Sequence, residues 1–196
     1  MFLNSLSVAQ LDSFAEWTRE YIGYSISPVR SIGHVSLMLR GDTSAAAYNL
    51  VDMGYGFSQI FPVLAQIWLG VQRTSDRGLE TPTLYRTIAI EQPELHLHPA
   101  FQAKIADTLA GAVTASRSTR VGWLAFVVET HSEVLINRLG ELVSQGKLNP
   151  EDIAIYLFNK DPQEQISYVK TSEFDRDGVL SNWPFGFFSG RQITSG

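Results

Sequence analysis

The sequence contains no cysteine, and charged residues make up only 18% of its 196 residues. The absence of cysteine excludes disulfides and thiolate metal sites, and it is compatible with the cytoplasmic location that we expect. A charged fraction below the roughly 25% of an average globular domain leaves more surface for burial against a partner. The formal net charge of −5 argues against this chain gripping nucleic acid by phosphate neutralisation.

Three sequence features common in other protein classes are also missing. No apolar run approaches the roughly 18 residues that would span a membrane, so we expect no membrane association. The first residues, Met-Phe-Leu-Asn-Ser-Leu, lack the basic and apolar regions of a signal peptide. No segment reads G-x-x-x-x-G-K-[ST], the phosphate loop of many nucleotide hydrolases.

What is present predicts an α/β fold, because apolar strands alternate with amphipathic helices. We expect helices over 7–22, 58–71, from Pro99 onward and over 132–145, with strands over 34–40, 87–90, 121–128, 153–158 and 166–169. The runs 87–90 and 121–128 are continuously apolar, as in parallel strands that are buried on both faces. Residues 42–55 are expected to form a loop or short helix and 72–86 a surface loop. A hydrophobic content of 44% and the absence of internal repeats favour one domain over residues 1–196.

An acidic residue ends the first of these apolar strands, in the segment I-A-I-E-Q-P-E-L-H-L-H-P at Ile88–Pro99. This acid, Glu91, stands at the carboxyl end of an expected parallel strand, where open α/β sheets bind ligands. Mg²⁺ takes one or two carboxylates together with phosphate oxygens. Glu91 is therefore the candidate metal ligand, and the alternative is a surface acid in a loop.

A histidine follows the second apolar strand, in the segment E-T-H-S-E at residues 129–133. Because parallel strands end at the same edge of a sheet, His131 can reach a phosphate that is held near Glu91. It could donate a hydrogen bond to the γ-phosphate and to the attacking water. The alternative is a core histidine at a strand end.

Glycines precede an expected amphipathic helix in D-M-G-Y-G-F-S-Q, residues 52–59. Glycine allows the backbone to approach a ligand closely, and the N–H groups and dipole of a helix N-terminus favour anions. Gly54, Gly56, Ser58 and Gln59 are the candidate phosphate-contacting residues. The same pattern also occurs in simple turns. Pro62 is expected in the first turn of this helix, where N–H groups are free.

Together these segments resemble the ABC-type ATPases, and most closely the OLD (overcoming lysogenization defect) nucleases and related predicted AAA-family ATPases. Residues 87–94 resemble the Walker B segment, and His131 resembles the switch histidine. Residues 52–59 resemble the signature segment, which faces the γ-phosphate held by the opposite subunit. The segment D-R-D-G-V-L-S-N-W-P-F-G-F-F at 175–188 resembles the C-terminal tail of the same ATPases.

The resemblance implies a partial P-loop NTPase sheet with flanking helices, lacking the N-terminal Walker A portion, and ATP with Mg²⁺ as cofactors. The chain would be the C-terminal lobe, either a piece of a longer protein or the product of a split gene. Its partner would be a second copy or a chain that carries the Walker A lobe. The assembly would couple ATP to DNA transactions or phage defence, with nucleic acid bound elsewhere. Residues 153–188 would form a hairpin and an aromatic tail, too short for the nuclease domain of the OLD proteins.

Gln92 departs from the ABC pattern, in which a glutamate after the metal-binding acid polarises the attacking water. A glutamine can orient water, but it cannot accept a proton at neutral pH. Glu94 is the candidate base in its place. Gln92, Glu94 and His131 form the expected catalytic set.

Two other classes of function stay open. A non-catalytic interaction module is favoured by Gln92 and by the missing Walker A segment. A metal-dependent hydrolase would use the histidines, because H-x-H with a distant histidine recurs in zinc sites. Alternate residues of an extended segment point to opposite sides, which disfavours the second alternative. Its ligands would come from Glu91, Glu94, His96, His98 and His131.

Overall fold

The structure is a computed structural model, and it describes residues 6–41, 46–75, 84–118, 122–160 and 166–183. The chain divides into two compact units, residues 1–132 and 133–196, which are described separately below. The sequence predicts a single domain over residues 1–196, and this stays a prediction. Within the described ranges, no helix has the length and apolar character needed to cross a membrane.

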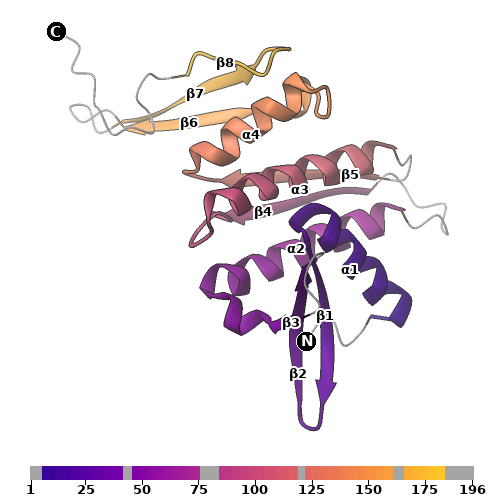
Figure 1. Cartoon of the computed structure of the whole chain (residues 1–196). Coiled ribbons are helices and arrows are strands. Elements are labelled where there is room, and N and C mark those ends of the chain that lie inside the picture. Colours follow the sequence, from indigo (N-terminus) through magenta and orange to yellow (C-terminus); the bar gives the residue numbers. More distant parts are fainter. Residues whose placement is uncertain (1–5, 42–45, 76–83, 119–121, 161–165, 184–196) are drawn as a thin grey trace. The chain divides into compact units, whose positions relative to one another are not determined.

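The first unit combines three helices with an antiparallel and a parallel sheet (Figure 1). Its elements are α1 (Val8–Ile22), β1 (Tyr24–Ser31), β2 (His34–Gly41), β3 (Ala47–Asn49), the 3-10 turn η2 (Leu50–Met53), α2 (Tyr55–Ser75), β4 (Leu84–Glu91), α3 (Pro99–Ser118) and β5 (Gly122–Glu129).

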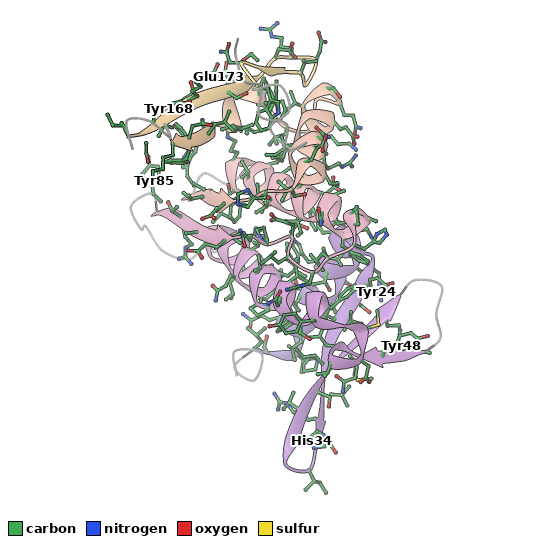
Figure 2. The ribbon with its side chains drawn as sticks, turned by 90° about the vertical axis from the view of Figure 1, so that its left-hand side faces the viewer. Tyr24, His34, Tyr48, Tyr85, Tyr168 and Glu173 are labelled. Carbon is green, nitrogen blue, oxygen red and sulfur yellow. The ribbon has the colours of Figure 1, made fainter. Side chains whose placement is uncertain are left out.

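Helix α1 begins and ends where local chemistry dictates. The Ser7 hydroxyl accepts a hydrogen bond from the N–H of Gln10, and the Gln10 side chain accepts one from the N–H of Ser7, which forms a capping box. Gly23 ends the helix in the left-handed region at φ 82°. The chain then forms the β1–β2 hairpin, which extends away from the helices and carries His34 at its tip (Figures 1 and 2). The sequence predicts β2 but neither β1 nor β3.

The core of this unit lies between α1, α2 and the inner end of the hairpin. The Phe14 ring meets Trp68 edge to face, with centroids 5.3 Å apart, and both side chains are fully buried. Ile26 of β1 and Leu39 of β2 are buried as well. Burial of these large side chains supplies most of the driving force that holds α1 and α2 against the hairpin.

Strands β4 and β5 pair in parallel, as the sequence predicts, with Leu84 opposite Gly122 and Glu91 opposite Glu129. One face of the pair lies against α2, where Gly70 approaches the side chains of Ile88 and Leu124. The prediction that both faces are buried is wrong. The opposite face is exposed along its described length, and its large apolar side chains are Tyr85 (77% exposed), Trp123 (51%) and Val127 (62%). The apolar runs thus supply two faces, and within the first unit the described residues cover one.

The expected boundaries around α2 need correction. The helix begins at Tyr55, not at Ser58, and it continues to Ser75. Residues 72–86 are therefore not one loop, since α2 ends inside them and β4 begins at Leu84. Pro62 lies inside the helix instead of in its first turn.

The second unit packs α4 against an antiparallel sheet. It contains α4 (Glu133–Ser144), the 3-10 turn η3 (Pro150–Asp152), β6 (Ile155–Lys160), β7 (Ser167–Phe174) and β8 (Leu180–Ser181). The predicted hairpin is confirmed, with Ile155 opposite Ser172. Gly146, at φ 67°, follows α4 as predicted. The Asp175 carboxylate accepts from the N–H groups of Asp177 and Val179 and forms the expected turn, whereas residues 184–188 of the aromatic tail lie outside the described residues.

Candidate functional site

The parallel pairing brings two acidic strand ends together. Glu91 ends β4 directly opposite Glu129 of β5, and the next residue, Gln92, donates its N–H to the carbonyl of Glu129 at 2.8 Å. Both glutamates are exposed. Glu129 was not among the candidates taken from the sequence. It ends an apolar strand just as Glu91 does, and this similarity could have identified it. Two carboxylates side by side at the carboxyl edge of a parallel sheet suit a hard cation.

Gln92 has an unusual backbone. Its φ angle is 42°, in the left-handed region that residues other than glycine and asparagine seldom adopt. Gln92 directly follows Glu91, and its side chain is partly buried. Such conformations persist where the surroundings impose them, and they cluster at functional sites. The strained turn directs the chain away from the sheet edge immediately after the candidate metal ligand.

Glu94 and His131 are brought together, and the contact is made by the main chain of the histidine and not by its imidazole. The Oε1 atom of Glu94 accepts a hydrogen bond from the backbone N–H of His131 at 2.8 Å. The Glu94 side chain is buried, with 7% of the residue exposed, whereas His131 is exposed. The imidazole of His131 is therefore open to a ligand while its backbone is held.

Gln102, in the first turn of α3, joins the same two loops and was missed by the sequence analysis. Its Oε1 accepts from the Ser132 hydroxyl at 2.6 Å, and its Nε2 donates to the carbonyl of Leu97 at 3.0 Å. A glutamine in the first turn of an expected helix, shortly after a strand-end loop, is the signal that the sequence offered. Ser132, expected to cap α4, thus also contacts α3.

The remaining two histidines of the expected metal set have other contacts. The ring of His96 lies 5.2 Å from that of Tyr55, edge to face. The Nδ1 atom of His98 accepts from the N–H of Ala100 at 3.2 Å, at the start of α3. Within the described ranges, no three His, Cys, Asp or Glu side chains gather in a way that could hold a metal. The geometry therefore gives no support to a hydrolase built on His96, His98 and His131.

Of the signature-like residues 52–59, Asp52 and Met53 end the 3-10 turn η2, and residues 55–59 form the beginning of α2 instead of a loop before it. Gly54 precedes the helix at φ 94°, while Gly56, Ser58 and Gln59 lie in its first two turns. Gly56 is buried so closely against the loop after β4 that a β-carbon there would come within 2.5 Å of the carbonyl oxygen of His96. The helix N-terminus thus lies beside the same loop that carries Glu91 and Glu94.

Aromatic contacts hold this helix N-terminus in place. The Phe57 ring meets Phe101 of α3 edge to face at 4.8 Å and Tyr24 at 5.8 Å. Helix α3 begins directly after the loop, at Pro99. The starts of α2 and α3 therefore enclose residues 92–98 from two sides.

Family comparison covers most of the chain. The model of the family described as "AAA domain, putative AbiEii toxin, Type IV TA system" matches residues 4–137. A second family, described as a protein of unknown function (DUF3696), matches residues 148–189. The gap between the two matches lies just beyond the boundary of the two compact units, in α4 and the turn that follows it. No curated protein matches the chain.

Structural comparison identifies heads of SMC ATPases. One solved structure, from "Structural biochemistry of ATP-driven dimerization and DNA stimulated activation of SMC ATPases", has a TM-score of 0.53 at 12% identity, over 83% of this chain and 85% of that one. Another, "Crystal structure of the SmcHead bound to the C-winged helix domain of ScpA", has a TM-score of 0.48 at 10% identity, over 84% of this chain and 42% of that one. On the first of these likenesses, the fold is α/β and resembles that of an ABC-type SMC ATPase, consistent with a partial P-loop NTPase fold.

Proposed function

Since the chain belongs to this AAA-domain family, we propose that it is the C-terminal, ATP-binding lobe of an ABC-type ATPase. The observation that carries the proposal is the in-register parallel pair β4–β5. The pair puts Glu91 and Gln92 at the edge of the sheet that also carries His131, two residues beyond Glu129. This is the edge at which open α/β sheets bind phosphate ligands.

Glu91 is the residue that would hold Mg²⁺, and the exposed carboxylate of Glu129 beside it makes the donor set suitable. When bound, the cation would neutralise charge on the β- and γ-phosphates. The exposed imidazole of His131 donates to the γ-phosphate. Gln92 orients the attacking water without taking its proton, which favours slow turnover and a long-lived ATP-bound state.

Residues 52–59 are proposed to act on the nucleotide of a second subunit. In the first turn of α2, Tyr55 is exposed and Ser58 is partly exposed, and the N-terminus of a helix favours an anion. The partner is a second copy of this lobe or a chain that carries the Walker A segment. We place the protein near the OLD-like ATPases because of the P-E-L-H-L-H-P segment, and we propose that its assembly acts on DNA, in phage defence or a related process.

The test requires the phosphate loop. The chain is co-expressed with, or fused to, a lobe that carries G-x-x-x-x-G-K-[ST], and Mg-dependent ATP hydrolysis is measured. Glu91→Gln should remove the Mg dependence of ATP binding, and His131→Ala should lower turnover about 10²-fold or more. Glu151→Gln, the same chemical change at an exposed position in η3, is the matched control. If the assembled protein binds no Mg·ATP, or if Glu91→Gln behaves as the control does, the proposal is wrong.

A second candidate function is a non-catalytic interaction module of the same assembly. The observation that favours it is Gln92, which stands where a proton acceptor is expected. This module would bind Mg·ATP in the assembled state and would not hydrolyse it in the wild type or in any variant at Gln92 or Glu94.

A further inference from the structure

The two loops that follow β4 and β5 are joined at three places. The N–H of Gln92 bonds to the carbonyl of Glu129, and the carboxylate of Glu94 bonds to the N–H of His131. The side chain of Gln102 bridges the Ser132 hydroxyl and the carbonyl of Leu97. Main-chain groups of both loops are thus held by side chains, so the loops are constrained relative to each other.

Glu94 is poorly placed to accept a proton from water. The residue is 7% exposed, and its Oε1 atom is already bonded to the main chain of His131. Its Oε2 atom is buried and has no hydrogen-bond partner among the described residues. A carboxylate that is removed from solvent and engaged with a backbone donor serves better as a fixed acceptor than as an exchanging base.

We propose that Glu94 is a positioning residue that sets the backbone of His131 relative to Glu91, and that Gln102 is the second brace of the same unit. The expected effect on ATP hydrolysis rests on the proposed function, whereas the constraint on the His131 backbone does not. The exposed His131 side chain can meet a γ-phosphate only if its backbone lies at a fixed height above the sheet edge. Glu94, three residues after Glu91, fixes the position of the His131 backbone relative to the metal-binding loop. The loop that holds the metal acid and the loop that senses the γ-phosphate then move as one body.

The sharpest test compares two substitutions of similar size. Glu94→Gln keeps an oxygen acceptor, whereas Glu94→Met keeps the volume and removes it. In the chain without nucleotide, the amide exchange rate of His131 is measured by NMR. Glu94→Met should speed this exchange by about tenfold, which corresponds to the loss of one hydrogen bond, while Glu94→Gln, which keeps a neutral acceptor, should speed it clearly less. Unchanged exchange in Glu94→Met would overturn the proposal.

A second measurement separates positioning from base catalysis. In the assembly with the phosphate loop, Glu94→Gln should keep kcat within about fivefold and Glu94→Met should lose it, whereas a general base would lose about 10²–10⁴-fold in both variants. Equal loss in both, with His131 exchange still protected in Glu94→Gln, would make Glu94 the base and overturn the proposal. If no variant hydrolyses ATP, the proposed enzyme activity fails, and the exchange rates alone decide for or against the brace. If Glu94→Met does not fold, Gln102→Ala, which removes the acceptor of the Ser132 hydroxyl, replaces it, and normal exchange of the His131 amide there would count against the brace.

Discussion

At the scale of single residues, Gln92 combines an unusual backbone φ angle with a side chain that departs from the glutamate of the ABC pattern. Its φ of 42° costs free energy, of the order of 1 kcal/mol for such a conformation, and a glycine or asparagine would relieve it. The hydrogen bond from its N–H to Glu129 keeps the turn in place. The strained turn directly after Glu91 is consistent with our proposal that Gln92 acts at the reaction centre.

We predict that Gln92→Glu raises ATP turnover in the assembly that contains the phosphate loop. Glutamate is nearly the same size as glutamine, so the backbone can keep its conformation, and a proton acceptor is gained near the nucleophile. General-base catalysis contributes about 10²–10⁴-fold, so steady-state hydrolysis should rise by at least about tenfold. His131→Ala should abolish the gain because the γ-phosphate loses its donor. An unchanged rate in Gln92→Glu would show that residue 92 does not face the attacking water.

Gly56→Ala tests whether the start of α2 must lie against the loop after β4. The added methyl group would come within 2.5 Å of the His96 carbonyl oxygen and 2.8 Å of Leu97, so backbone has to shift. We expect a destabilisation of about 1–3 kcal/mol, in the range of overpacked cores, measured by urea unfolding. Gly54→Ala meets no atom within 4 Å but forces alanine to φ 94°, so it separates backbone strain from the clash. Wild-type stability in Gly56→Ala would mean that the two segments are not packed as described.

At the scale of elements, the sequence predicts most of the architecture because the strongest signals are local. The capping serine of α1, the apolar runs of β4 and β5 and the Asp-Gly turn after β7 each specify their own segment. Strand β1 was missed because its apolar residues do not alternate regularly and it contains Pro28. Its pairing with β2 along eight residue pairs supplies what its own sequence does not indicate.

The start of α2 and the role of Glu94 could not be predicted, for a shared physical reason. Tyr55 to Phe57 become helical where Phe57 packs on Phe101, a residue far along the chain. Glu94 becomes an acceptor for the His131 amide only after β4 and β5 have paired. Both features depend on contacts between distant segments, and the spacing of residues along the sequence does not reveal such contacts.

The exposed face of β4–β5 gives a prediction at the same scale. Val127→Ser should leave the stability of the isolated chain within about 0.5 kcal/mol, because an exposed side chain loses little on truncation. Leu124→Ser, on the other face of the same strand, is the matched control. It is buried under α2 and should cost about 2–5 kcal/mol. The measurement is thermal unfolding of both variants. Equal losses would show that the exposed face is covered within the chain itself.

At the scale of the whole molecule, we predict that the isolated chain binds Mg·ATP no better than about millimolar. The phosphate loop supplies most of the backbone N–H groups and the lysine that hold the β- and γ-phosphates, and no such segment occurs among the 196 residues. What remains is Glu91, His131 and a helix N-terminus. Titration calorimetry that gives micromolar affinity for this chain alone would contradict the half-site.

We further predict that the isolated chain associates, with itself or with a lobe that carries the phosphate loop. A parallel sheet normally has both faces covered, yet one face of β4–β5 carries three large, half- to mostly exposed apolar side chains, at Tyr85, Trp123 and Val127. An uncovered apolar face and an unpaired strand edge are the features through which chains associate. The net charge of −5 provides only weak repulsion between copies.

Light scattering across concentrations should therefore show species larger than a monomer at high micromolar concentration. Trp123→Lys with Val127→Lys should shift the population towards the monomer, because charges on the exposed face oppose its burial. The same double change should weaken binding of the phosphate-loop lobe if that lobe uses this face. Lysines at Val8 in α1 and Val29 in β1, which are 75% and 50% exposed, control for added charge. A wild-type chain that stays monomeric throughout would mean that the exposed face does not drive assembly, and the proposed partner would then have to dock through another surface.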